Sequence, residues 1–218
     1  MKTKSTSRQT GFTLVEISIV LVIIGLLIGG VLRGQEIINS AKVKNLAQDF
    51  RNVQTILYAY QDKFRALPGD DIRAPGHFCP PGAPGCVSPG DANGTIDGAW
   101  NAPATANVES IYFWQHVRFA NLTTGPTDTA NPNFLPTNNI GGRIGIQSGG
   151  AAAPLGVLGS YVICSSGIPG KLIRQLDGTL DDGDPETGSM RAGITTAGPA
   201  IALANLDDSA VYVACLGF

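Results

Sequence analysis

The side chains that most often carry out chemistry are few in this chain. Its two histidines are His77 and His116. Its four cysteines are Cys79, Cys86, Cys164 and Cys215. We find no phosphate-cradling glycine loop, no HExxH pair and no recognisable setting for a nucleophile in the sequence. We therefore expect that the protein is not an enzyme.

The cysteines are expected to form disulfide bonds, although four cysteines allow three connectivities. Pairing between near neighbours favours Cys79 with Cys86 and Cys164 with Cys215. The second bond would close a loop of about 50 residues, which chain entropy makes worth roughly 4 kcal/mol. An alternative is a zinc site at His77, Cys79 and Cys86, with His116 as a fourth ligand. That spacing fits no standard zinc motif, and disulfides are typical of an oxidising compartment.

Two acidic clusters raise the question of a calcium site. The first contains Asp91, Asn93 and Asp97, and the second contains Asp181, Asp182, Asp184 and Glu186. Oxygen-bearing side chains that alternate around a glycine resemble part of a calcium loop, but the first cluster lacks the later bidentate glutamate of an EF-hand. Asp, Asn and Gly are also the residues that ordinary turns require. Turns are the preferred interpretation, so no cofactor is expected and calcium is the alternative.

Charge and turn residues divide the chain after Ala66. Residues 1–66 hold nine basic and four acidic side chains, which gives a net charge of +5. Residues 67–218 hold six basic and thirteen acidic side chains, which gives a net charge of −7. All 14 prolines and 23 of the 28 glycines lie in the second part. This division predicts a long helix followed by a compact, loop-rich domain. It excludes a disordered chain and a strongly basic nucleic-acid binder.

The first part begins with a polar segment and continues as an apolar one. Residues 1–11 carry three basic side chains and no acid, whereas Phe12–Leu32 has Glu16 as its only charge. These 21 residues would span about 32 Å as a helix, which matches a bilayer core of about 30 Å. We therefore predict a transmembrane anchor over residues 12–33. Basic residues flank it on both sides, so charge alone does not orient it.

The helical pattern continues beyond the anchor. Apolar residues alternate at spacings of three and four at Val43, Leu46, Phe50, Val53, Leu57, Tyr60 and Phe64. This spacing predicts an amphipathic continuation over residues 34–66, whose apolar face packs on its own domain in preference to a free coiled coil. Anchor and continuation form one helix from about residue 12 to residue 65, which Leu67-Pro68-Gly69 ends.

Residues 67–218 are predicted to form a globular head domain. Asn107–Leu122 is predicted to be a short helix with Asn107 as its cap. Strands are predicted at Arg143–Gln147, Leu158–Cys164 and Ala210–Leu216, which are rich in β-branched residues and bounded by turn residues. A small antiparallel sheet packed on the long helix gives an α+β fold.

The motif GFTLVE at residues 11–16 carries a family resemblance. With the basic segment before it and the apolar helix after it, the motif resembles the processing signal of type IV prepilins and of the pseudopilins of type II secretion. The resemblance covers about residues 1–66. It implies a pilin-like fold, a prepilin leader peptide at residues 1–11, cytoplasmic cleavage between Gly11 and Phe12, and N-methylation of Phe12. It also orients the helix, with the leader inside and the head outside.

Glu16 is the residue expected to direct assembly. An acid within an apolar run costs on the order of 2.5–3.5 kcal/mol at the bilayer centre. Cleavage would create an ammonium on Phe12, and in a stack of parallel helices displaced along their axes this amine would meet the Glu16 of a neighbour. The pair would neutralise both charges in an apolar filament core. Processing would then switch the protein from membrane storage to assembly.

The expected function is that of a structural subunit of a type IV pilus-like filament, or fimbrium, which polymerises through its N-terminal helix. The alternatives are a type II secretion pseudopilin and a membrane-anchored binding module that does not polymerise. The implied partners are other pilins in a homo-oligomer or mixed filament, the prepilin peptidase, the inner-membrane assembly platform and membrane lipid, with no nucleic acid. The implied location is the bacterial inner membrane, then a surface pilus or a periplasmic pseudopilus. Adhesion and secretion remain alternative roles.

Overall fold

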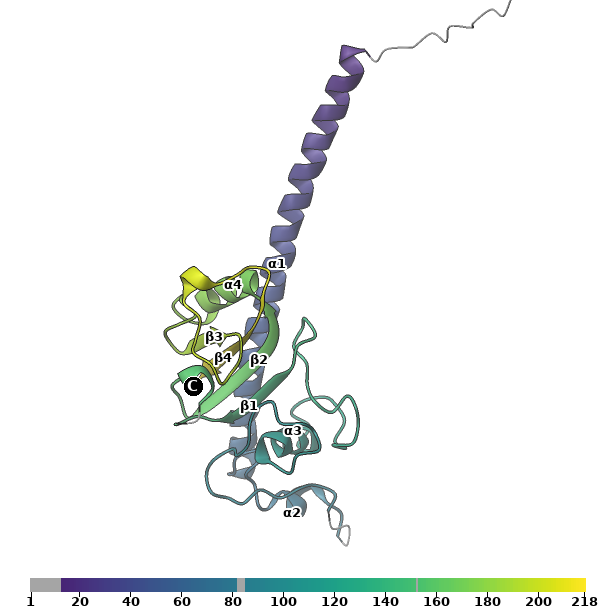
Figure 1. Cartoon of the computed structure of the whole chain (residues 1–218). Coiled ribbons are helices and arrows are strands. Elements are labelled where there is room, and N and C mark those ends of the chain that lie inside the picture. Colours follow the sequence, from purple (N-terminus) through teal and green to yellow (C-terminus); the bar gives the residue numbers. More distant parts are fainter. Residues whose placement is uncertain (1–12, 82–84, 152) are drawn as a thin grey trace, which may run out of the picture. The chain divides into compact units, whose positions relative to one another are not determined.

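A computed structural model describes residues 13–81, 85–151 and 153–218 (Figure 1). The helices are α1 (Leu14–Phe64), α2 (Ala74–Phe78), α3 (Glu109–Phe119) and α4 (Gly170–Leu180). The strands are β1 (Ile144–Ser148), β2 (Tyr161–Pro169), β3 (Met190–Gly193) and β4 (Val211–Gly217). The chain divides into two compact units, residues 1–40 and 41–218, and the boundary falls within α1.

The part of α1 in the first unit is apolar and exposed. Its large aliphatic side chains between residues 14 and 32 leave about half or more of their surface uncovered, and none of the most apolar stretch is buried. Within the described residues, α1 is the one helix long and apolar enough to cross a membrane. Exposed aliphatic surface on this scale calls for lipid or another apolar partner.

The part of α1 in the second unit is amphipathic. Its buried residues are Val43, Leu46, Ala47, Phe50, Val53, Leu57 and Tyr60. The prediction that this apolar face packs on its own domain is therefore confirmed, with Phe64 at its end partly buried. The helix ends where Arg65 adopts a left-handed backbone conformation with φ of 54°, shortly before Pro68.

The four strands form one antiparallel sheet in the order β1-β2-β4-β3 (Figure 1). Ile163 of β2 belongs to the main core with the buried residues of α1, whereas its neighbours Val162 and Cys164 belong to a second cluster. Successive side chains of a strand point to opposite faces, so each face of this sheet is covered. The α+β fold, with a long helix on a small antiparallel sheet, is as predicted.

The structure also differs from the sequence prediction. The three predicted strands are present with shifted bounds, but α4, β3 and the short helix α2 were not predicted. Asn107 as the cap of α3 is wrong, because the residue before the helix is Val108 and no side chain caps it. The N–H of Ser110 instead donates to the carbonyl oxygen of Asp97 at 2.9 Å. A contact with a distant loop thus replaces the local cap.

Candidate functional site

The side chains of Thr13 and Glu16 cap the N-terminal end of α1. The N–H and the hydroxyl of Thr13 each donate to Oε2 of Glu16 at 2.8 Å, and the N–H of Glu16 donates to the Thr13 hydroxyl at 3.3 Å. This is a reciprocal capping box, which the Thr-x-x-Glu spacing could have signalled. Gly11 and Phe12, the expected processing residues, lie outside the described residues.

Glu16 is exposed and is the one charged residue between positions 13 and 32. Among the described residues, no lysine, arginine or histidine lies within 4 Å of its carboxylate. The two Thr13 donors occupy one oxygen, so the carboxylate retains capacity to accept hydrogen bonds from a cation. A charged acceptor on an otherwise apolar helix is suited to a partner that brings a donor into an apolar setting.

Both cysteine pairs favoured by the sequence are joined in the structure. Cys164 and Cys215 are directly paired residues of β2 and β4, fully buried, with Cα atoms 4.0 Å apart. Cys79, directly after α2, is joined to Cys86, with Cα atoms 5.7 Å apart. A disulfide sulfur is not a thiolate, so Cys79 and Cys86 are not the zinc ligands of the alternative interpretation.

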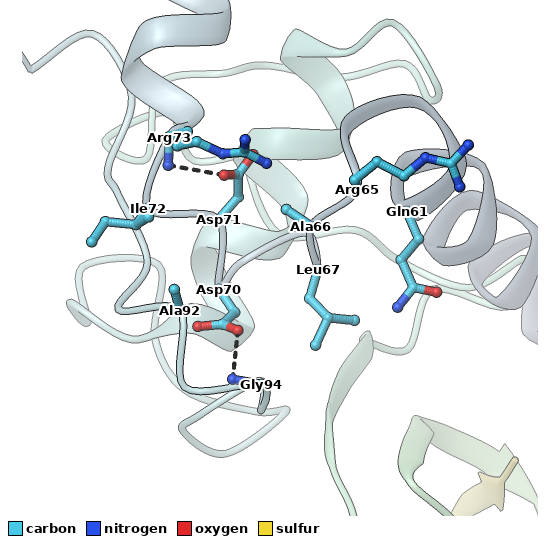
Figure 2. A pocket seen from close by; sticks show the side chains of 10 residues that line it. All are labelled: Gln61, Arg65, Ala66, Leu67, Asp70, Asp71, Ile72, Arg73, Ala92 and Gly94. Carbon is cyan, nitrogen blue, oxygen red and sulfur yellow. Dashed lines mark hydrogen bonds between the residues drawn. The ribbon is translucent and has the colours of Figure 1, made fainter.

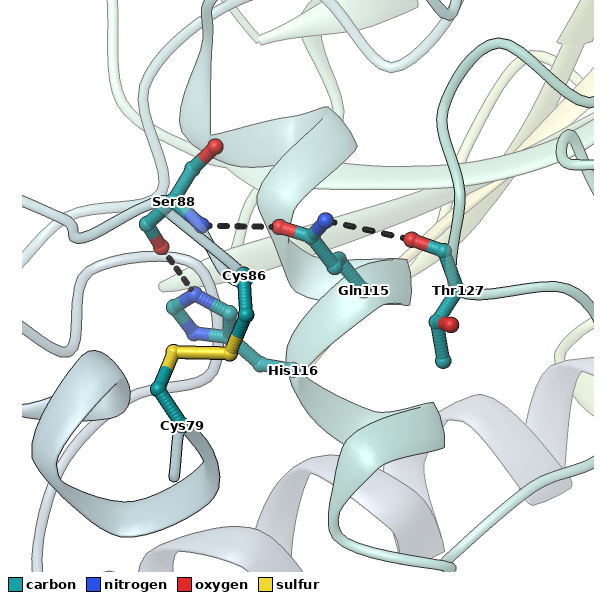
Figure 3. The surroundings of a disulfide bond; sticks show 6 residues. All are labelled: Cys79, Cys86, Ser88, Gln115, His116 and Thr127. Atoms are coloured by element: carbon teal, nitrogen blue, oxygen red, sulfur yellow. Dashed lines mark hydrogen bonds between the residues drawn. A yellow bond between two sulfur atoms is a disulfide. The ribbon is translucent and has the colours of Figure 1, made fainter. Parts of the chain in front are cut away.

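A polar network surrounds the Cys79–Cys86 bond (Figure 3). The N–H of Ser88 donates to Oε1 of Gln115 at 2.9 Å, and the Gln115 amide donates to the carbonyl oxygen of Thr127 at 3.1 Å. The network fastens the segment after Cys86 to α3. This is a structural task, because every contact in it links one backbone segment to another.

His116 is part of the same network and is fully buried. Its Nδ1 accepts from the N–H of Gly69 at 3.0 Å, and its Nε2 lies 2.7 Å from the carbonyl oxygen of Ser88. These contacts assign the proton of the neutral ring to Nε2. Burial lowers the pKa of His116, so the ring is held neutral and both nitrogens are used.

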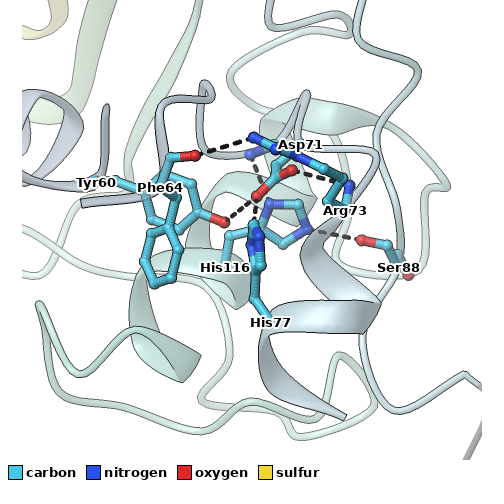
Figure 4. Close-up of polar contacts among 8 residues, drawn as sticks. Tyr60, Phe64, Asp71, Arg73, His77, Ser88 and His116 are labelled. Carbon is cyan, nitrogen blue, oxygen red and sulfur yellow. Dashed lines mark hydrogen bonds and ion pairs between the residues drawn. The ribbon is translucent and has the colours of Figure 1, made fainter. Parts of the chain in front are cut away.

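A second network ties the end of α1 to α2 through the carboxylate of Asp71 (Figure 4). Asp71 is buried and accepts from the Tyr60 hydroxyl at 2.8 Å, the Arg73 N–H at 2.9 Å and Nδ1 of His77 at 3.0 Å. The Arg73 guanidinium donates to the carbonyl oxygen of Phe64 at 3.1 Å. Burial and the Asp71 carboxylate raise the pKa of Tyr60 well above its usual range. His77 and His116 thus lie in hydrogen-bonded structural positions.

The first acidic cluster forms the contacts of a tight turn. The Asn93 amide donates to Asp91 at 3.1 Å and to Asp97 at 3.0 Å. Two buried carboxylates that sequence reasoning missed, Asp70 and Glu109, lie beside it, and oxygens of Asp70, Asp91 and Glu109 are within 4.8 Å of one another. Burial raises the pKa of Glu109. Asp70 and Glu109 lie far apart in the sequence, so no local spacing of residues could predict that they meet.

Asp70 faces an open pocket of about 510 Å³ (Figure 2). Its carboxylate accepts from the N–H of Asn93 at 2.9 Å and of Gly94 at 2.8 Å. Arg65 and Arg73 also line the pocket, which lies at the end of α1. The Asp70 carboxylate thereby fixes the first acidic turn against the segment that leaves the long helix.

The second acidic cluster also forms turn contacts, between α4 and β3. Asp181 accepts from the N–H of Met190 at 2.9 Å, Asp182 from the N–H of Asp184 at 3.0 Å, and Asp184 from the N–H of Glu186 at 3.1 Å. A buried acid of α4, Asp177, accepts from the N–H of Gly183 at 2.7 Å and was not predicted to take part.

Residues 6–32 match the family model of the prokaryotic N-terminal methylation motif. This motif is the signature of type IV pilins and pseudopilins. Searches of curated proteins and of solved structures found no match for the chain. The matched residues contain the expected processing residues and the described capping box of α1. The motif indicates a structural, pilin-like precursor, and its apolar helix is consistent with membrane anchoring.

The motif also bears on the partners of the chain. In general it implies processing by a prepilin peptidase and assembly with other pilin subunits. The matched residues lie in the unit whose aliphatic surface is exposed. The sequence therefore identified the N-terminal methylation motif, whereas it did not identify the buried acids Asp70, Glu109 and Asp177 of the head.

Proposed function

We propose that the chain is a prepilin that is cut between Gly11 and Phe12, methylated on Phe12 and polymerised into a type IV pilus-like filament. The observation that carries the proposal is the methylation motif at residues 6–32, which leads into an exposed apolar helix with one exposed carboxylate. Before assembly, the apolar surface of the helix anchors the precursor in the inner membrane. Neighbouring helices then replace lipid in the filament.

Glu16 directs this transfer. In the precursor its carboxylate contacts Thr13 and has no basic partner among the described residues. Cleavage places an ammonium at Phe12, which the Glu16 of a neighbouring subunit accepts. Pairing removes the cost of two isolated charges in an apolar filament core. An uncut chain has no amine at that position, so cleavage sets the time of assembly.

The head suits a subunit that folds outside the cytoplasm, and we take a surface pilus as the first candidate. Two disulfide bonds are favoured in an oxidising compartment, and the periplasm and the cell surface both meet this condition. Its partners in this role are further copies or other pilins, the prepilin peptidase and the inner-membrane assembly platform. A type II secretion pseudopilin uses the same N-terminal chemistry and is the second candidate.

The test compares Glu16→Ala with the matched control Glu36→Ala. Glu36 is an exposed glutamate of the same unit that pairs with Arg33 at 2.9 Å. We expect both variants to be membrane-inserted and processed, with filaments in the shear fraction of the control and none from Glu16→Ala. Normal filaments from Glu16→Ala would refute the role of Glu16.

Mass spectrometry and imaging of the same strains separate the remaining candidates. The expected mature chain begins at Phe12 and carries one added methyl group. Filaments on the cell surface identify a pilus, and filaments confined to the periplasm identify a pseudopilus. A chain that keeps residues 1–11, or a mature chain that never sediments as filaments, would favour a membrane-anchored binding module.

A further inference from the structure

The exposed side of α1 in the second unit carries a regular pattern of its own. Lys44, Arg51 and Tyr58 recur at a spacing of seven residues, so they lie along one side of the helix, outside its buried face. All three are exposed. Among the described residues, no acid lies within 4 Å of Lys44 or Arg51. The Lys44–Tyr58 face, defined by these three residues, therefore presents two unpaired cations and an aromatic ring.

Glu186, in the loop between α4 and β3, has a carboxylate without a partner. In the described part of residues 41–218, every other acidic side chain accepts a hydrogen bond or pairs with a basic side chain. The N–H of Glu186 donates to Oδ1 of Asp184 at 3.1 Å, while its side chain is exposed. The turn therefore uses the backbone of Glu186 and leaves its carboxylate available.

Glu186 borders a largely apolar hollow of about 480 Å³. Ile194, Pro199 and Ile201 line this hollow, and Ile194 leaves 71% of its surface uncovered. Exposed aliphatic surface beside a hollow is typical of an interaction site. The Glu186 hollow, defined by these four residues, combines apolar surface with one free carboxylate. These properties complement the cations and the aromatic ring of the Lys44–Tyr58 face.

We propose that the Lys44–Tyr58 face of one copy docks on the Glu186 hollow of a second copy in the filament. The Arg51 guanidinium pairs with the Glu186 carboxylate. Tyr58, which lies about 10 Å further along α1, enters the hollow and packs on its aliphatic side chains. Lys44 adds a second cation to the attraction. The inference rests on the proposed function, because it requires that the chain polymerises.

Charge and symmetry identify the occupant as a second copy. Residues 67–218 carry a net charge of −7, whereas the Lys44–Tyr58 face is positive, so two copies attract each other through these surfaces. The face and the hollow are different patches of one chain, so their contact is heterologous. Each copy then uses its face towards one neighbour and its hollow towards another, and a contact of this kind that does not close into a ring continues as a helical filament.

Charge reversal tests the pairing in the full-length chain. Arg51→Glu and Glu186→Arg should each lower the amount of filament in the shear fraction at least about tenfold, because like charges then face each other. The double variant Arg51→Glu with Glu186→Arg restores opposite charges and should restore filaments. The control Lys42→Glu makes the same change at an exposed lysine about 200° around the helix from Lys44, and it should assemble normally.

A pair of matched variants tests the hollow. Ile194→Asn places a polar group where the aliphatic side chain should contact Tyr58, so we expect fewer filaments. Leu158→Asn makes the same change at a 75% exposed position outside the hollow and should leave the amount of filament unchanged. Equal amounts from these two variants would contradict the placement of Tyr58.

Cross-linking of Arg51→Lys filaments with a carbodiimide reports the contact itself. The reagent joins an amine to a neighbouring carboxylate, so we expect covalent dimers in a denaturing gel and a peptide pair that joins positions 51 and 186. Adding Glu186→Gln to Arg51→Lys should remove this peptide pair. Wild-type filaments without this contact would give no such pair in the Arg51→Lys variant.

The outcomes separate this contact from the proposed function. If the wild type forms filaments, undiminished filaments from both single reversals, or a double reversal that stays defective, would overturn the contact and leave the proposed function intact. Loss of membrane insertion in Arg51→Glu would assign the face to anionic lipid and would also overturn the contact. A wild-type chain that forms no filaments would refute the proposed function and this contact with it.

Discussion

The Cys164–Cys215 bond should contribute more to stability than the Cys79–Cys86 bond. The first closes a loop with a sequence separation of 51 residues and the second a loop with a separation of 7. Chain-entropy estimates give about 4 kcal/mol for the long loop and about 2.5 kcal/mol for the short one. The buried sulfurs of Cys164 and Cys215 also pack in a cluster with Trp100, so their removal leaves space in the core.

The assay compares two double variants, Cys164→Ala with Cys215→Ala and Cys79→Ala with Cys86→Ala. Urea unfolding of the full-length chain in detergent micelles, followed by tryptophan fluorescence, should show a larger loss for the first by at least about 1.5 kcal/mol. Equal losses, or a larger loss for the Cys79 and Cys86 variant, would refute the reasoning from loop length and burial.

Three further outcomes follow from the core and its networks. Phe50→Ala should destabilise the head by about 3–5 kcal/mol in denaturant unfolding, because Phe50 is fully buried. Tyr60→Phe should cost about 1–2 kcal/mol, because Asp71 loses a donor, whereas Tyr58→Phe at a 54% exposed position should cost nothing measurable. His116 has a lowered pKa when folded, so unfolded His116 binds a proton first as pH falls below 6.5. Stability should fall over that range, and His116→Gln should reduce the slope of a melting-temperature series against pH.

The long helix could be predicted because its signals are local. The apolar spacing of Val43, Leu46 and Phe50 follows the helical period, and the same residues are buried in the structure. The motif at residues 11–16 likewise depends on neighbours in sequence. Features of this kind need no knowledge of the tertiary fold.

The elements that escaped prediction depend on packing. α4 begins with Gly170 and contains Gly178, which lower helix propensity, yet Leu172, Ile173 and Leu176 bury one side of it against the sheet. β3 has four residues, too few for an alternating pattern. The buried acid Asp70 acquires its partners Asn93 and Gly94 only when separate segments meet. The formation of α4 and β3 and the contacts of Asp70 therefore depend on burial and on long-range hydrogen bonds, which the local sequence does not reveal.

The position of β4 has a consequence for the order of folding. β4 lies between β2 and β3, so no sheet of the observed order can form until residues 211–217, close to the end of the given sequence, are available to pair. Until then Cys164 lacks its partner Cys215, while Cys79 and Cys86 are already present in the same chain. Cys164 can therefore pair with the wrong cysteine before β4 is in place, and a thiol–disulfide isomerase should raise the yield of correctly folded protein.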